Sequence, residues 1–311
     1  MDLPEEILKG NSRAVAKGIS LVEDDGAEAQ SMMKSLFPHT GRSTIIGITG
    51  APGSGKSTLV DQIVSQISME DSRIGIIAVD PSSPFTGGAI LGDRIRMMRH
   101  SQNPDIFIRS MATRGHLGGL AKSTGEAISI LEAAGKKYIL IETVGVGQDE
   151  VEVVKMADIV LVVLIPGAGD EIQAFKAGIM EIADAFVLNK ADSPETLRAE
   201  RQLKAMLDLG LKDHTVPPVC KTVATTGKGI VELWSTVQDL MKTRSQKDMM
   251  FRKKRLIEWM LRDIINAKVS RAVQSRMDED EFSRFIDLIY RRETDPYSVA
   301  DGIIGRLKGI V

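Results

Sequence analysis

The sequence predicts an α/β fold in which helices flank a mostly parallel central sheet. Short β-rich runs alternate with helical stretches from Thr44 to about Lys242. The runs are continuously apolar rather than alternating, which is typical of strands covered on both faces and therefore of parallel sheets. They are TIIGITG, RIGIIAVD, IFIRSMA, KYILIET, IVLVVLI, AFVLNK and PVCKTVA. We expect residues 1–42 to form an N-terminal helical extension, 43–245 the α/β domain and 246–311 a C-terminal helical region.

The two flanking regions show helical patterns. Residues 1–42 contain short amphipathic stretches, with Asn11 and Ser12 as candidate N-terminal caps. The C-terminal region repeats apolar residues at i, i+3, i+4 and i+7, which predicts two amphipathic helices. These residues are Ile257, Met260, Leu261 and Ile264, then Phe282, Phe285, Ile286 and Ile289. Such stripes need burial, either on the chain's own α/β domain or on a second copy of the chain, and the pattern leaves both open.

The composition excludes several classes of protein. The 311-residue chain is 43% hydrophobic and 26% charged, and its formal net charge of −2 shows no bias towards nucleic acid. No apolar run approaches the roughly 18 residues of a membrane span. The acidic N-terminus lacks the order of a signal peptide. Cys220 is the only cysteine, which excludes an internal disulfide. We therefore expect a cytoplasmic protein that binds neither nucleic acid nor membrane.

A phosphate-binding loop follows the first apolar run. GITGAPGSGKST carries the pattern G-x-x-x-x-G-K-[ST], and the amphipathic run STLVDQIVSQI continues from it. Glycines let backbone N–H groups turn towards phosphates, and the N-terminus of a helix adds a positive dipole end. We expect Lys56 to reach the β- and γ-phosphates and the Ser57 hydroxyl to bind magnesium. The expected nucleotide contacts of this nucleoside triphosphate site are Gly50, Ala51, Pro52, Gly53, Ser54, Gly55, Lys56, Ser57 and Thr58.

A second motif predicts which base is bound. VLNKAD places Asn189, Lys190 and Asp192 at the carboxyl end of the sixth apolar run. The Asp192 carboxylate can accept hydrogen bonds from the ring N1–H and the exocyclic amine of guanine, whereas adenine offers no such donor pair. The aliphatic stem of Lys190 can lie along the face of the base. The N-K-x-D pattern, in this position after a phosphate loop, favours GTP over ATP.

Three carboxylates are candidates for one magnesium site. Asp80 ends the second apolar run, Asp93 follows a loop rich in proline and glycine, and Glu142 ends the run KYILIET. Ligands of open α/β sheets collect at the carboxyl ends of the strands, and magnesium prefers hard oxygen ligands. A polar residue in these places can also simply end a strand or cap a helix, and the residues alone leave that open.

Taken together, these motifs resemble the MeaB/ArgK family of G proteins, the bacterial relatives of the human methylmalonic aciduria type A protein. The resemblance rests on GAPGSGKSTL, AVDPSSPFTGGAILGDRIRM, TRGHLGGL, IETVGVGQDEVEV, PGAGDEIQAFKAGIMEIAD and NKAD, which span residues 50–192. It implies a P-loop NTPase fold and a Mg²⁺-dependent GTPase that yields GDP and phosphate. It also implies a metallochaperone that gates adenosylcobalamin loading and protects a B12-dependent acyl-CoA mutase, chiefly methylmalonyl-CoA mutase. A homodimer built through the C-terminal helices is implied as well.

The resemblance also assigns roles to residues. It implies that Glu142 replaces, as the magnesium-side carboxylate, the aspartate that is usual in nucleotide switches, and that Gly145 would contact the γ-phosphate. The implied metal ligands are Ser57, Asp80, Asp93 and Glu142. The implied catalytic residues are Lys56, Asp93, Glu142 and, in a loop that responds to nucleotide and partner, Lys176. VATTGKG departs from the Ser-Ala pair common in the base-cap loop, which leaves a backbone contact at Ala224 but puts a side-chain contact at Thr225 in doubt.

Two alternative functions use the same kind of phosphate loop. A P-loop kinase or transport-associated ATPase needs ATP, which the N-K-x-D pattern disfavours, and no site for a substrate hydroxyl or guanidinium is recognisable. A nickel-insertion GTPase needs a cluster of histidines or cysteines, whereas the chain has four histidines and one cysteine. A comparison of GTP with ATP binding separates the first alternative from the GTPase, and a metal titration separates the second.

Overall fold

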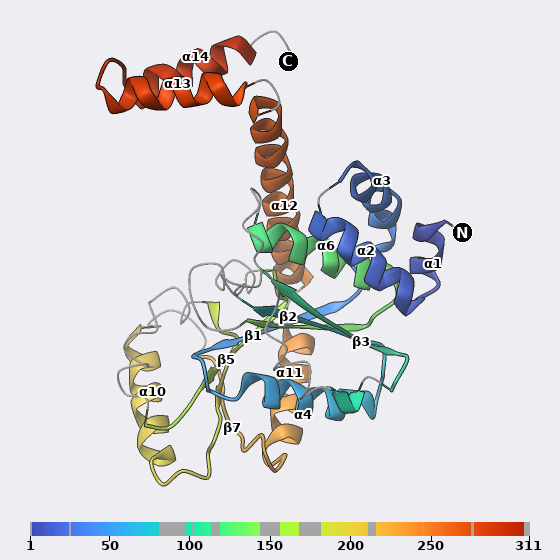
Figure 1. Cartoon of the computed structure of the whole chain (residues 1–311). Helices are drawn as coiled ribbons and strands as arrows, with labels where there is room; N and C mark the ends of the chain where they lie inside the picture. The colour runs from blue at the N-terminus through green and yellow to red at the C-terminus, as the bar shows by residue number, and fades with distance from the viewer. Residues whose placement is uncertain are drawn as a thin grey trace. The chain divides into compact units, whose positions relative to one another are not determined.

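The computed structural model (Figure 1) describes residues 2–24, 26–80, 98–100, 102–112, 119–143, 156–167, 182–210, 216–244, 246–274 and 277–307. The chain divides into a larger unit, Met1–Ile257, and a C-terminal unit, Glu258–Val311. Among the described residues, no helix combines the length and hydropathy of a membrane span.

A seven-stranded sheet forms the centre of the larger unit, counted over the described part of the chain. Its strands are β1 Thr44–Gly50, β2 Ile74–Asp80, β3 Ile106–Ala112, β4 Tyr138–Thr143, β5 Ile159–Leu164, β6 Ala185–Leu188 and β7 Val219–Lys221. They are ordered β3-β2-β4-β1-β5-β6-β7, and every pair is parallel. Every residue of β4 and β5 is buried, as their continuous apolar runs predict. The predicted α/β fold is confirmed.

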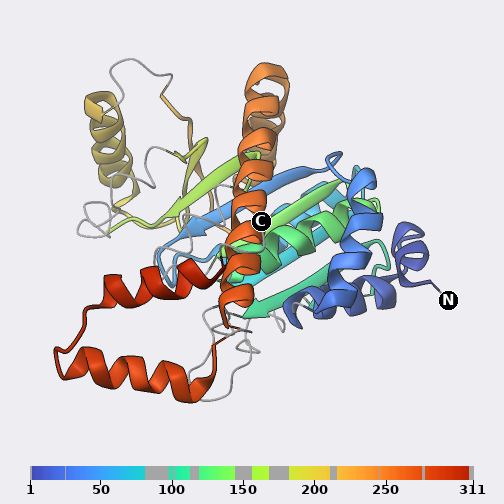
Figure 2. The same cartoon turned by 90° about the horizontal axis from the view of Figure 1, so that it is seen from above.

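Helices cover both faces of this sheet, as Figures 1 and 2 show. On one face, α4 (Lys56–Ser68) and α11 (Ile230–Thr243) pack on each other and on the central strands. Their apolar side chains, including Leu59, Ile63 and Trp234, join those of β1 and β5 in one core. α6 (Gly119–Ala133) covers the other face, against β2 and β3, and α10 (Thr196–Gly210) follows β6 in the chain.

The N-terminal extension packs on α6. It consists of α1 (Leu3–Leu8), α2 (Ser12–Asp24), α3 (Ala27–Leu36) and the short 3₁₀ helix η1 (Phe37–His39). Asn11 caps α2 as predicted, because its Oδ1 accepts from the N–H groups of Arg13 at 3.0 Å and Ala14 at 3.3 Å. Ile7, Ile19 and Leu36 are fully buried, so these helices belong to the core of the larger unit.

The start of α12 (Gln246–Gln274) is attached to the amino-terminal end of the sheet. Asp184, which precedes β6, forms ion pairs with Arg244 and with Arg252 of α12. Arg252 Nη1 also donates to the carbonyl oxygen of Asp158 at 3.1 Å, and the Asp158 carboxylate accepts from Ile45 N at 2.9 Å. These contacts lie within the larger unit and on the edge of the sheet opposite to the phosphate loop.

The C-terminal unit is helical, as the apolar periodicity predicts. It contains the rest of α12, then α13 (Glu279–Tyr290) and α14 (Pro296–Leu307). Asp278 caps α13 by accepting from Asp280 N, and Asp295 caps α14 by accepting from Tyr297 N at 2.9 Å. The assignment of residues 1–42, 43–245 and 246–311 to separate functional domains stays a prediction.

Candidate nucleotide-binding site

The phosphate loop connects β1 to α4 and depends on two glycines. Gly50 has a φ of 148°, and a Cβ atom there would lie 2.3 Å from the carbonyl oxygen of Val163 on β5. Gly55 has a φ of 89°, and a Cβ atom there would lie 2.5 Å from Nδ2 of Asn189. Both positions therefore require glycine for conformation and for space. The loop as a result lies directly against β5 and the N-K-x-D motif.

Lys56, the first residue of α4, folds back over the loop. Its ammonium group is buried and donates to the carbonyl oxygens of Gly50 at 2.7 Å and Ala51 at 2.9 Å. A buried positive charge that is held by carbonyl oxygens is well placed to attract phosphate oxygens. Lys56 therefore lies at the phosphate loop, and its contact with the β- and γ-phosphates stays a prediction.

Ser57, the residue after Lys56, contacts Glu142. The Ser57 hydroxyl donates to Oε1 of Glu142 at 2.6 Å, and both side chains are buried. Glu142 lies near the carboxyl end of β4, where its register partner on β1 is Ile48. The pairing of β4 with β1 brings this carboxylate to the first turn of α4, so the sheet joins two predicted metal ligands.

Asn189 links the phosphate loop to the loop that follows β7. Its Nδ2 donates to the carbonyl oxygen of Ser54 at 2.8 Å. Its Oδ1 accepts from Thr222 Oγ1 and from Ala224 N, both at 3.1 Å. The side chain is 2% exposed, so these three bonds satisfy it in the interior. Asn189 therefore holds together two loops that are 135 and 35 residues away from it in sequence.

The other two residues of the N-K-x-D motif point outwards. Lys190 has a φ of 56°, which is uncommon for a residue other than glycine. The turn is held by hydrogen bonds from Ala191 N to the Thr222 carbonyl at 3.0 Å and from Ser193 N to the Lys190 carbonyl at 3.1 Å. Lys190 and Asp192 are exposed, so a base can reach both side chains from solvent.

Comparison with known proteins decides which class of nucleotide-binding protein this is. The family model described as methylmalonyl-CoA mutase-associated GTPase MeaB matches residues 15–278. The chain belongs to the MeaB family of GTPases. A putative GTPase of Pyrococcus horikoshii is 48% identical, with 99% of this chain and 98% of the relative covered.

Further relatives agree with this assignment. The GTPase ArgK of Escherichia coli is 33% identical, with 92% of this chain and 89% of ArgK covered. The mitochondrial methylmalonic aciduria type A homolog of Mus musculus is 35% identical, with 75% of this chain and 61% of the homolog covered. A crystal structure described as an LAO/AO transport system kinase superposes with a TM-score of 0.69 at 24% identity. The match covers 98% of this chain and 96% of the other chain, and it supports the fold. This MeaB-family chain is a GTPase that hydrolyses GTP.

The donor set beside the phosphate loop fits a magnesium ion. Ser57 Oγ and the Glu142 carboxylate are hard oxygen ligands held 2.6 Å apart, and magnesium prefers such ligands. Asp80 ends β2, and the residue before it, Val79, is paired with Thr143 of β4, so the backbone of Asp80 lies at the same edge of the sheet. Of the four predicted ligands, the structure brings Ser57 and Glu142 together. P-loop GTPases in general use Mg²⁺ with the nucleotide.

Several predicted residues fall outside the described part of the chain. They are Asp93, Gly145 and Lys176, and their roles stay predictions.

Thr222 is a site residue that we did not predict, although its hydroxyl donates to Asn189. In the sequence, Thr222 can be recognised only as a polar residue within the last apolar run. In the structure, Lys221 of β7 is in register with Leu188 of β6. That register places Thr222 beside Asn189. Ala224 was expected to contact the base through its backbone, and in the structure its N–H donates to Asn189.

Proposed function

We propose that this MeaB-family GTPase is a metallochaperone that gates adenosylcobalamin loading and protects a B12-dependent acyl-CoA mutase, with methylmalonyl-CoA mutase as the expected client. The description of the matching family names association with that mutase, and a relative is named for methylmalonic aciduria. GTP and GDP are the ligands, the mutase is the partner, and the active form is a homodimer.

The observation that supports this role most directly is the bond between Ser57 and Glu142. Ser57 belongs to the helix that follows the phosphate loop, whereas Glu142 is followed, after Thr143, by residues 144–155. A nucleotide state in which the Ser57 hydroxyl binds another partner breaks its hydrogen bond to Glu142. The nucleotide state therefore also changes the environment of Glu142. A local event at the phosphates can therefore be passed to the chain that leaves β4, as in other nucleotide switches.

The proposed site distributes roles among residues of this chain. Magnesium, held by Ser57, Asp80, Asp93 and Glu142, would neutralise charge on the phosphates. Lys56 holds the β- and γ-phosphates, Gly145 contacts the γ-phosphate, and Asn189, Lys190 and Asp192 hold guanine. The phosphate loop has no arginine that could stabilise the transition state, so the GTPase should be slow alone. A partner that completes this charge-stabilising environment would accelerate it.

The test is release of phosphate from GTP with and without the mutase. A saturating mutase should raise the rate, and Lys176→Ala should reduce this stimulation by about 10²-fold, as for loss of one transition-state donor, while GTP binding is retained. Lys242→Ala is the matched control, because Lys242 is 73% exposed on α11, far along the chain from the phosphate loop. Equal rates with and without a mutase that demonstrably binds would disprove the client and leave the GTPase activity untouched.

The proposed homodimer uses the C-terminal unit. Leu261, Ile265 and Val269 of α12 are 56%, 50% and 56% exposed and recur every four residues, so they form one apolar face of the helix. Isolated exposed apolar residues are normal, but a continuous stripe on a helix is typical of an interface between helices.

The dimer is tested by light scattering after size-exclusion chromatography. Leu261→Glu should convert a dimer into a soluble monomer, because it places a charge in the apolar stripe. Arg262→Ala is the control, since Arg262 pairs with Glu258 of the same helix at 2.8 Å and is 74% exposed. Deletion of residues 258–311, which leaves the pair between Arg252 and Asp184 in place, should likewise give a soluble monomer. Aggregation of that shortened chain would show that these helices cover their own domain.

A further inference from the structure

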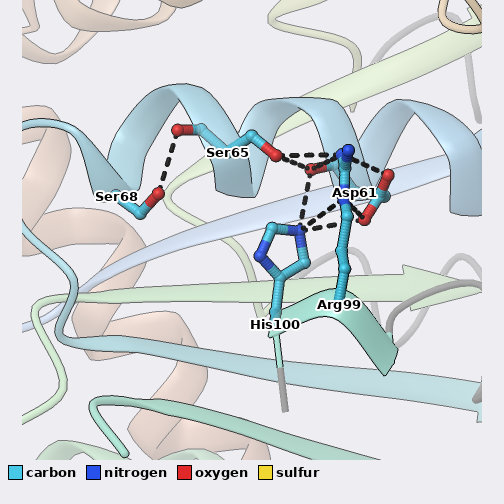
Figure 3. Close-up of polar contacts among 5 residues, drawn as sticks. All are labelled: Asp61, Ser65, Ser68, Arg99 and His100. Atoms are coloured by element: carbon cyan, nitrogen blue, oxygen red, sulfur yellow. Dashed lines mark hydrogen bonds and ion pairs between the residues drawn. The ribbon is translucent and has the colours of Figure 1, made fainter. Parts of the chain in front are cut away.

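The helix that begins with Lys56 has a polar face, which Figure 3 shows in part. Ser57, Asp61, Ser65 and Ser68 follow one another at intervals of four, four and three residues, so they lie along one side of α4. Ser65 Oγ donates to the carbonyl oxygen of Asp61 and Ser68 Oγ to that of Ser65, each at 2.9 Å. The face begins at the proposed magnesium ligand Ser57 and continues down the helix.

Two residues from another part of the chain bind this face at Asp61 through hydrogen bonds and ion pairs. They belong to η2 (Met98–His100), the turn that precedes β3. Arg99 Nε donates to Asp61 Oδ1 at 2.6 Å, and its Nη2 donates to the Asp61 carbonyl at 3.1 Å, to Ser65 Oγ at 2.9 Å and to Asp61 Oδ2. His100 Nε2 lies 2.9 Å from Asp61 Oδ1 and 3.2 Å from the Asp61 carbonyl. Figure 3 shows both side chains converging on one turn of α4.

These contacts are directional, and the carboxylate that they hold is buried. Asp61 and His100 are each 8% exposed, so the carboxylate depends on its two partners for its solvation. Well-packed apolar side chains of similar volume often stabilise a protein as well as a buried ion pair does. Apolar side chains lack the fixed geometry of a guanidinium, which here contacts four atoms of one helical turn. The cluster defines the rotation and the height of α4 more sharply than packing of apolar groups would.

We propose that Asp61, Arg99 and His100 are positioning residues for GTP hydrolysis, which fix the rotation of α4 and thereby place Ser57 against Glu142. The inference deepens the proposed magnesium site and rests on it. Ser57 and Asp61 are one turn apart, about 6 Å along the axis, so a rigid turn of helix transmits a rotation from one to the other. A rotation of about 15° displaces a side-chain atom roughly 5 Å from the axis by about 1.3 Å. Misplacement of about 1 Å at a reacting site can cost roughly a hundredfold in rate.

Asp61→Asn tests the proposal, because it keeps the volume of the side chain and removes the charge that Arg99 and His100 grip. The expected results are a fall in the rate of GTP hydrolysis of roughly tenfold to a hundredfold and a higher Mg²⁺ concentration at half-maximal rate. A readout independent of hydrolysis is the release of a fluorescent GDP analogue. Mg²⁺ should slow this release in the wild type and slow it much less in the variant.

Asp71→Asn is the matched control, because it also removes a carboxylate that is bound by an arginine near α4. Asp71 lies just beyond α4 and accepts from Arg73 Nε at 3.0 Å and Nη2 at 2.7 Å, but its pair is not on the face that carries Ser57. Asp71→Asn should leave both the Mg²⁺ requirement and the release of GDP unchanged. A shift as large as that of Asp61→Asn would mean that any lost ion pair has this effect, and would overturn the proposal.

The outcomes separate this proposal from the magnesium site on which it rests. If hydrolysis and GDP release by the wild type do not depend on Mg²⁺, the magnesium site itself is wrong. If the wild type depends on Mg²⁺ and folded Asp61→Asn has the same Mg²⁺ requirement, only the positioning role is wrong. If Asp61→Asn does not fold, Arg99→Lys replaces it, since the Arg99 side chain is 48% exposed and lysine keeps the charge without the fork. That variant should show a smaller shift in the same direction, and an unchanged Mg²⁺ requirement would overturn the proposal.

Discussion

Replacement of Asn189 tests whether one buried amide holds the phosphate loop and the loop after β7 together. Asn189→Ala removes three hydrogen bonds, to Ser54, Thr222 and Ala224, in a position that is 2% exposed. A buried hydrogen bond contributes about 0.5–1.5 kcal/mol, and a buried partner left without one adds to the loss, so the variant should lose about 3–4 kcal/mol of stability.

Two further variants divide this energy among the bonds. Thr222→Val keeps the volume of the side chain and removes only its bond to Asn189, so it should cost about 1 kcal/mol. Asn189→Asp keeps the acceptor for Thr222 and Ala224 but replaces the donor that serves Ser54 with an oxygen. The Ser54 carbonyl, 2.8 Å away, would then face a carboxylate. We expect this variant to weaken GDP binding at least as much as Asn189→Ala.

The assay is urea denaturation followed by tryptophan fluorescence, combined with titration of a fluorescent GDP analogue. Trp234 is a suitable reporter because it is buried in the core of the larger unit, where its ring packs edge-on against Tyr138 at the start of β4. If Asn189→Ala unfolds within about 0.5 kcal/mol of the wild type, a change typical of an unimportant surface substitution, the three bonds do not hold the loops. If Asn189→Ala loses only as much unfolding free energy as Thr222→Val, the bond between Asn189 and Thr222 alone carries the stabilisation.

Three other substitutions have specific expected outcomes. Asp192→Asn should shift preference from guanine to xanthine nucleotides, and unchanged affinity for GTP in a binding titration would disprove the base assignment. Gly50→Ala should destabilise the fold and impair nucleotide binding, because its Cβ would lie 2.3 Å from the Val163 carbonyl; wild-type thermal stability would contradict the geometry. Burial raises the pKa of Asp158 above its ordinary value of 3.8, so the folded state holds this proton more tightly than the unfolded state. The stabilisation by this group is therefore complete below about pH 3.8 and is lost as the pH rises through the raised pKa, by up to about 1.4 kcal/mol per pH unit. Asp158→Asn should remove this decline from the curve of unfolding free energy against pH, and parallel curves for variant and wild type would refute it.

Local features of the sequence were enough to predict the elements and much of the chemistry. Continuous apolar runs predicted the buried strands, because a strand covered on both faces needs apolar residues at every position. The glycines around Lys56 predicted a phosphate loop, since the backbone must turn where side chains would collide. Asn11 was recognisable as a cap because helix caps act over a few neighbouring residues.

Only the tertiary structure decided which of these residues meet. Ser57 and Glu142 are 85 residues apart and touch because β4 pairs with β1. Asn189 joins the phosphate loop to Ala224 because the sheet places β6 between β5 and β7. Arg99 and His100 look like ordinary residues of a basic stretch until η2 comes to lie against Asp61. Strand order and the contacts between distant segments follow from packing of the whole domain, and local periodicity carries no record of them.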